Sequence, residues 1–193
     1  MAQTLITVQE VLDYGNLNND ALRPRITALL ASVFAAGEEY CGRKFSSESF
    51  TEYFDAVGQS HVTLANPPAT VLNSVTDDAQ NSARSIDTGA DVLWLEEYKR
   101  KGEVRLYNAE GSFNGGIAGV KVVYTGGWTS STIPLELKNA LCAEVLFQLG
   151  ERAIGIGSQS ADGVSMTYRV RGGFAEETAQ VLDKYRLWWK EIG

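Results

Sequence analysis

The single histidine and the two cysteines of this 193-residue chain are the side chains best suited to nucleophilic chemistry. A nucleophile-and-base mechanism would have to pair His61 with a serine or a cysteine. His61 lies in the alternating run 60–64, which predicts a surface position on a strand. Cys41 falls at the C-terminal end of a predicted helix, where the helix dipole disfavours a thiolate. We therefore predict no nucleophilic catalysis.

The same residues do not suggest a metal site. Zinc sites need several cysteines or histidines at short spacings, and the chain has one histidine and no Cys-x-x-Cys. Cys41 and Cys142 lie about a hundred residues apart on predicted helices. A disulfide is compatible with that spacing, but lone thiols on helices are typical of small buried apolar residues. We predict neither a metal nor a cofactor.

Two further patterns could carry chemistry, and both favour a structural interpretation. Residues 155–160 (GIGSQS) look like a phosphate loop, but they follow a predicted helix and lead into an extended segment, which is the wrong context. Adjacent carboxylates do not converge on one point of a strand or helix. Three such pairs occur, and we expect them to be solvated: Asp77-Asp78, Glu96-Glu97 and Glu176-Glu177. We predict that the protein is not an enzyme.

The net charge also limits the classes of function that the chain could have. The chain has 24 acidic and 17 basic residues and a net charge of −7, which argues against a general nucleic-acid binder. An acidic surface could still let duplex DNA pass without binding it. The one basic run, residues 99–101, lies between two predicted strands; a solubilising hairpin tip is favoured over a contact with an acidic partner. No apolar run reaches the ~18–20 residues of a membrane span, and no signal peptide is present, so we expect a soluble protein from a reducing compartment.

Helices are predicted at both ends of the chain. Thr7 and Glu10 have the spacing of a capping box and should open a short helix that ends at Gly15. A long helix should start near residues 18–20 and end at Gly42. One arc of roughly 100–120° on this helix is apolar: it holds Leu22, Ile26, Leu29, Leu30, Val33, Phe34 and Tyr40.

The opposite side of the long helix is unusually rich in small side chains, which would make it a flat, low-relief face. It carries Ala28, Ala31 and Ala35 beside Arg25, Ser32, Glu38 and Glu39. Small residues let another element approach closely. The alternative is a solvated face made of good helix formers.

The rest of the chain predicts an α+β fold. Short strands separated by turn-forming residues are expected at residues 50–55, 61–64, 71–75, 91–96, 103–107 and 119–124. A buried helix should run from Pro134 to about Gly150, followed by a Gly/Ser loop at 155–163, an extended segment at 164–170 and a last helix at 175–192. We therefore predict a helical bundle from residues 1–45 and 129–193, with a β-rich insertion, an antiparallel sheet or small barrel, at 46–128.

The order of these features resembles the head–tail connector (adaptor) proteins of tailed bacteriophages. The resemblance rests on the capped helix ITVQEVLDY, the helix end EEYCGRKF, the strand FTEYFDA, the segment NPPATVLNSV, the pair VVYTGGW and IPLELKNAL, and the terminal LDKYR. The YTGGW sequence followed by Pro134 and residues 137–140 is its most specific part. The insertion at 46–127 is longer than in compact members of that family, which leaves its neighbour undefined.

The resemblance implies a non-enzymatic virion protein at the neck, assembled in the host cytoplasm. Twelve copies would form a ring under the portal, extend the channel for double-stranded DNA without binding it specifically, and meet the next neck or tail protein. The helical part would build the ring, with Ala28, Ala31, Ala35 and Glu38 as candidate subunit contacts. The C-terminal segment would reach the portal, with Tyr185, Leu187, Trp188 and Trp189 as candidates.

Three alternatives remain open at this point. The first is a stopper or head-completion protein lower in the neck. The second is a β module in which Trp94, Trp128 and glycine-rich loops bind a glycan or another small molecule, although core packing explains Trp94 better. The third is an unrecognised hydrolase, which lacks a credible catalytic group.

Overall fold

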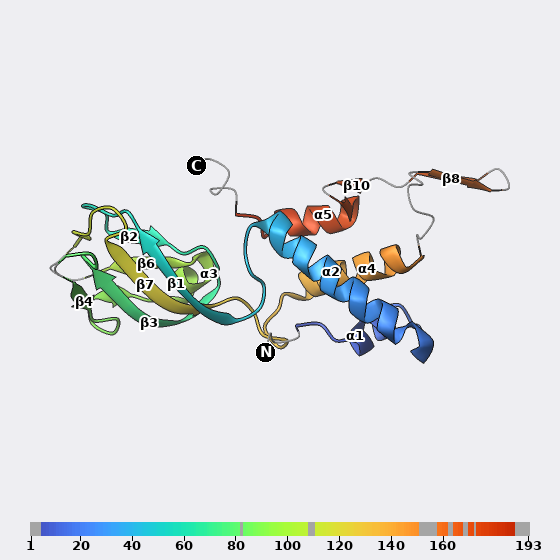
Figure 1. Ribbon diagram of the computed structural model, residues 1–193, viewed down its shortest axis with the longest axis horizontal. Coiled ribbons are helices and arrows are strands. Elements are labelled where there is room, and N and C mark those ends of the chain that lie inside the picture. Colours follow the sequence, from blue (N-terminus) through green and yellow to red (C-terminus); the bar gives the residue numbers. More distant parts are fainter. Residues whose placement is uncertain are drawn as a thin grey trace. The chain divides into compact units, whose positions relative to one another are not determined.

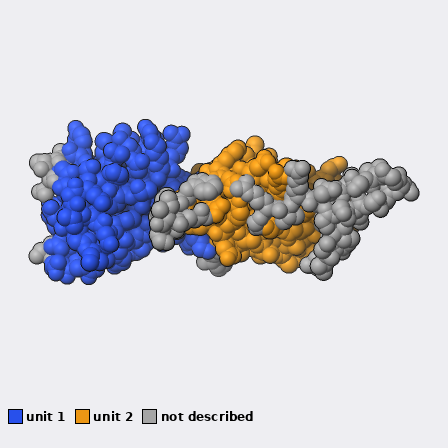
Figure 2. Space-filling view, turned by 90° about the horizontal axis from the view of Figure 1, so that it is seen from above, with its two compact units in different colours: residues 1–3, 44–129 blue, residues 4–43, 130–193 orange. Residues whose placement is uncertain are grey.

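The computed structural model describes residues 5–81, 83–107, 111–150, 158–161, 164–167, 170–171 and 173–187. The chain divides into two compact units (Figure 2). The β unit is Lys44–Thr129, and the helical unit combines Thr4–Arg43 with Ser130–Gly193. Helices and antiparallel strands together confirm the predicted α+β class. None of the helices in the described ranges combines the length and the apolar character needed to cross a membrane.

The helical unit begins with the elements that the capping signals predict. Helix α1 (Val8–Tyr14) has a complete capping box between Thr7 and Glu10 and ends at Gly15. A 3-10 turn, η1 (Asp20–Leu22), is capped by Asn19 and leads into α2 (Arg23–Cys41). Gly42 ends α2 with φ 67°, a left-handed conformation that costs glycine little.

Helix α2 packs its predicted core face against α4 (Leu135–Gly150) and α5 (Glu176–Asp183) (Figure 1). Its buried residues are Ile26, Leu29, Leu30, Val33, Gly37 and Cys41. Helix α4 contacts α1, α2 and α5, as expected for a helix that is apolar over more than half of its circumference. Four helices therefore share one apolar interior.

The C-terminal part of the helical unit differs from the prediction. The predicted loop 155–163 contains a strand, β8 (Ser158–Ala161), which pairs with β9 (Val164–Thr167). Strands β10 (Val170–Arg171) and β11 (Phe174–Ala175) precede α5. The predicted last helix, 175–192, ends at Asp183, so that part of the prediction is wrong. Trp188, Trp189 and Ile192 lie outside the described residues.

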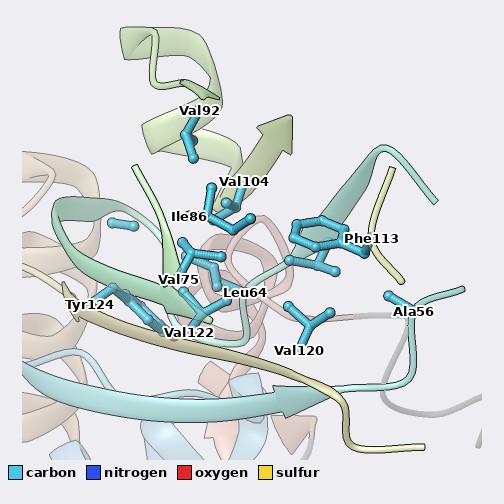
Figure 3. Close-up of a cluster of buried hydrophobic side chains, with 12 residues drawn as sticks. Ala56, Leu64, Val75, Ile86, Val92, Val104, Phe113, Val120, Val122 and Tyr124 are labelled. Atoms are coloured by element: carbon cyan, nitrogen blue, oxygen red, sulfur yellow. The ribbon is translucent and has the colours of Figure 1, made fainter. Parts of the chain in front are cut away.

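The β unit contains two antiparallel sheets rather than one. The first has the order β1-β7-β3-β4, from Glu48–Phe54, Val120–Gly126, Ala69–Asp77 and Arg84–Ile86. The second has the order β2-β6-β5, from His61–Thr63, Glu103–Leu106 and Val92–Leu93. Both sheets contribute to one apolar core (Figure 3). Its buried members are Ala56, Val62, Leu64, Ala69, Val75, Ile86, Val92, Val104, Phe113, Val120, Val122 and Tyr124.

The predicted strand at 91–96 is shorter than expected. It ends at Leu93, and the basic run lies in a helix, α3 (Glu96–Lys101), rather than at a hairpin tip. Lys99 pairs with Glu96 at 2.5 Å and Lys101 pairs with Glu97 at 2.7 Å. Ion pairs at these helical spacings stabilise a turn of helix over an extended chain. The cations are therefore largely matched within α3.

Candidate functional site

The low-relief face of α2 is exposed in this chain. Ala28, Ala31 and Ala35 are all exposed, and Glu38 beside them is half-buried. An uninterrupted helix of 19 residues places positions i, i+3 and i+7 on one side. The structure therefore brings the three alanines together on one surface, which we call the alanine face: Ala28, Ala31 and Ala35.

Contacts at both ends of α2 hold this face in place. Arg23 bonds Asp20 at 2.6 Å and Gln9 at 2.5 Å near the start of the helix. The Arg25 guanidinium donates to the Leu149 carbonyl at 3.0 Å. At the other end, the Tyr40 hydroxyl donates to Asp183 at 2.7 Å. A surface fixed in this way loses little conformational entropy when a partner binds it.

The segment after α5 is anchored inside the helical unit. The Lys184 ammonium and the Tyr185 hydroxyl donate to the Glu136 carboxylate at 2.7 and 2.6 Å. These two bonds lower the pKa of Glu136, while burial and the bond to Glu136 raise the pKa of Tyr185. The Leu187 amide donates to the Cys41 carbonyl at 3.1 Å. These contacts replace further helical turns, which explains why α5 stops at Asp183.

The side chains considered above for nucleophilic chemistry are a surface histidine and two buried cysteines. His61 is exposed on β2, as the alternation predicts. Both cysteines are free and buried, as predicted for small apolar residues. Burial raises the pKa of Cys41 to about 12 and that of Cys142 to about 11, which leaves almost no thiolate at neutral pH. Among the described residues, no three His, Cys, Asp or Glu side chains gather in a way that could hold a metal ion.

Two buried carboxylates were not expected from the sequence. Asp77, predicted to be solvated, is 1% exposed at the end of β3, so that prediction is wrong. It lies two positions after the buried Val75, and the period of a strand could have placed both on the inner face. Glu144 is also 1% exposed and lies between the buried Leu141 and Val145 of α4. Its helical spacing from Ala140 and Leu141 was the available signal.

Both tryptophans of the β unit pack against other apolar residues. Trp94 is half-buried against the core of the unit, as predicted. Trp128 is 7% exposed, and its ring lies 5.9 Å from that of Phe45, centroid to centroid. Trp128 therefore offers little surface to a glycan, and the core contacts of Trp94 agree with the packing role predicted for it.

A sequence model of the head completion protein family matches residues 4–188. The chain belongs to the head completion protein family. No curated protein matches this head completion protein. The family match confirms the predicted relationship to phage neck proteins, a group of virion structural proteins rather than enzymes.

Solved structures from gene transfer agent particles share its fold. The neck of an empty particle, computed with C6 symmetry, gives a TM-score of 0.61 at 16% identity and covers 95% of this chain and 90% of that chain. The virion of a native particle gives 0.59 at 16% identity, covering 96% and 92%. The neck of a native particle, computed with C12 symmetry, gives 0.58 at 15% identity, also covering 96% and 92%. The predicted location, a virion neck, agrees with the particles from which these structures come.

Proposed function

We propose that this head completion protein forms a closed ring in the neck of a tailed particle. The ring joins the portal to the tail or to the next neck protein and extends the DNA channel. The alanine face of α2 is the contact between neighbouring copies, and twelve copies complete the ring. Duplex DNA passes through without specific binding.

The observation that carries this proposal is the exposed alanine face on a helix whose opposite side is buried. In a closed ring each copy presents one face to the next, so a flat, small-residue surface is buried in every copy. The symmetric necks that share the fold support a ring, and membership of the head completion family supports a place at the head. The net charge of −7 suits a channel wall that must not retain DNA.

The test places one negative charge on the alanine face. Ala31→Glu should leave the monomer folded and prevent ring assembly, because the carboxylate would be buried between copies. Ala36→Glu is the matched control, since Ala36 is also exposed on α2 but is turned about 140° around the helix from Ala31. Mass photometry and electron microscopy of each variant, alone and with purified portal, measure the assembly. Rings of Ala31→Glu at the level of the unmodified protein would overturn the assignment of this face.

The same assay separates the two positions in the neck that the family allows. A protein that meets the portal binds purified portal directly, through the segment that follows Leu187 and carries Trp188 and Trp189. A stopper lower in the neck binds only after another neck protein has been added. Direct binding to portal is the outcome we expect.

A further inference from the structure

Strand β1 is an unusual edge strand. It has seven residues and pairs with β7 at every one of them, from Glu48↔Gly126 to Phe54↔Val120, without a register shift. The other edge strands of the two sheets, β4, β2 and β5, have three, three and two residues. Natural sheets protect their edges with short strands, lysine, proline or bulges. β1 has no lysine, proline or bulge; its charged residues are the exposed Glu48 and the half-buried Glu52, whose carboxylate accepts from the Tyr124 hydroxyl. In the described chain its outer edge has no neighbouring strand.

The hairpin formed by β8 and β9, in contrast, is a two-stranded sheet without a third strand among the described residues. Its strands pair at four positions, from Ser158↔Thr167 to Ala161↔Val164, and form a sheet of two strands only. The two intervening residues are Asp162 and Gly163, a sequence that favours two-residue hairpins. Across the part of the chain that the structure describes, each strand packs mainly on the other. Two-stranded sheets are marginal in water on their own, and a third strand stabilises them.

We propose that the β8–β9 hairpin of one copy adds to the free edge of β1 in the next copy. This inference rests on the proposed ring. Backbone N–H and C=O groups along both edges would then be paired, which is how added strands gain affinity. Each copy supplies one hairpin and accepts one, a head-to-tail arrangement that closes into a ring.

The residues that follow the hairpin have the opposite charge to those of β1. Residues 48–55 contain Glu48, Glu52 and Asp55 and no basic residue. The hairpin itself, residues 158–167, has a single charged residue, Asp162, and the two arginines Arg169 and Arg171 follow it directly in the sequence. Glu48 is exposed. Opposite charge guides the approach of two surfaces and disfavours pairing of β1 with a second β1, which would place like charges together.

The first test is crosslinking between copies that each carry one new cysteine. One set carries Ser49→Cys, Thr51→Cys or Tyr53→Cys, three exposed and uncharged positions in the paired part of β1. The other carries Gln159→Cys, Ser160→Cys, Ser165→Cys or Met166→Cys, two consecutive positions in each strand of the hairpin. A short bismaleimide added to each mixture should link two chains when rings form. Thr63→Cys, exposed on the edge strand β2, should give no link, and the buried Cys41 and Cys142 should not react.

The second test replaces residues 158–167 with a Gly/Ser linker of equal length. We expect ring assembly to fall at least tenfold while thermal unfolding of the monomer stays unchanged. If the linker variant assembles normally and no mixture crosslinks, this inference is overturned and the proposed ring stands. A link that forms only when both cysteines are in one chain would also overturn it, because the hairpin would then pair within its own copy. If the unmodified protein forms no ring even on portal, the proposed function itself fails.

Discussion

Each of the two units contains a buried carboxylate, and the two carboxylates stabilise their units through different kinds of partner. Asp77 lies at the end of β3 in the β unit, and Glu144 lies in α4 of the helical unit; each is 1% exposed. Asp77 accepts from the amides of Gly115 at 2.8 Å and Asn114 at 3.0 Å, and pairs with Arg84 at 2.9 Å. It therefore ties a loop to a strand and neutralises its charge in the same contact.

Glu144 has a different set of partners. It accepts from the Ala175 amide at 3.0 Å, just before α5, and from the Gln148 side-chain amide at 3.0 Å. The partners that the structure shows for Glu144 are both neutral. A buried charge is costly unless it is paired. The start of α5 is thus attached to α4 by a weaker link than the one that fixes the loop of the β unit.

The largest expected effect is that of Asp77→Asn. Both carboxylate oxygens accept hydrogen bonds, and an amide would turn N–H donors toward other donors and remove the negative charge that Asp77 presents to Arg84. Breaking a fully buried ion pair costs about 3–5 kcal/mol of unfolding free energy, and because the Arg84 side chain is 34% exposed we expect about 3 kcal/mol here. Hydrogen exchange measured by mass spectrometry should show faster exchange in peptides from the β unit. Cys41 and Cys142, both in the helical unit, should stay protected from a thiol reagent.

Asp87 provides the matched control for this effect. It is exposed, and its carboxylate accepts from the amides of Gly89 at 2.8 Å and Ala90 at 3.2 Å. Asp87→Asn changes the same chemistry without burial and should cost less than about 1 kcal/mol. Equal losses for the two variants would mean that burial and the Arg84 pair do not distinguish Asp77.

A smaller effect is expected for Glu144→Gln. The amide oxygen can still accept from Ala175, and Gln148 can turn its own oxygen toward the new amide, so the cost should stay within about 1 kcal/mol. Glu144→Ala leaves the half-buried Ala175 amide without this acceptor and should cost about 2 kcal/mol. Exchange in peptides covering 173–183 and the thiol reactivity of Cys142 report the change. The comparison fails if Glu144→Gln is as damaging as Asp77→Asn.

The fold could be predicted from the sequence where local interactions determine it, and not where contacts between distant residues do. Local rules were sufficient where the chain obeys them: the capping box of Thr7 and Glu10, the stop at Gly42, and most strands of the β unit. They were insufficient for the end of α5, because the contacts of Tyr185 and Leu187 come from residues far away in the chain. The short helix α3 was missed because the run 99–101 was expected to form a hairpin tip, whereas ion pairs at helical spacing stabilise a turn of helix there.

The proposed contact surfaces also differ in how far the sequence predicts them. The alanine face could be predicted because helical spacing alone places Ala28, Ala31 and Ala35 together. The β8–β9 hairpin was hidden by its Gly/Ser-rich surroundings, although Asp162-Gly163 between alternating residues was a usable signal. The free edge of β1 could not be predicted, since strand order depends on pairing between distant segments.

The smallest expected effect concerns Glu10, a partly exposed carboxylate of the helical unit that does have a cationic partner, Lys138. Burial raises the pKa of Glu10, but the bonds from Lys138 and Thr7 outweigh it and hold the pKa below its ordinary value of 4.5. A lowered pKa in the folded state means that the stabilisation is complete above pH 4.5 and is lost as the pH falls through the folded value. Glu10→Gln should therefore be less stable than the unmodified chain by about 0.5–1 kcal/mol at pH 7. Thermal melts followed by far-UV circular dichroism should show this difference in stability shrinking toward zero at low pH. A difference that does not change with pH would mean that the charge of Glu10 contributes nothing to the link between α1 and α4.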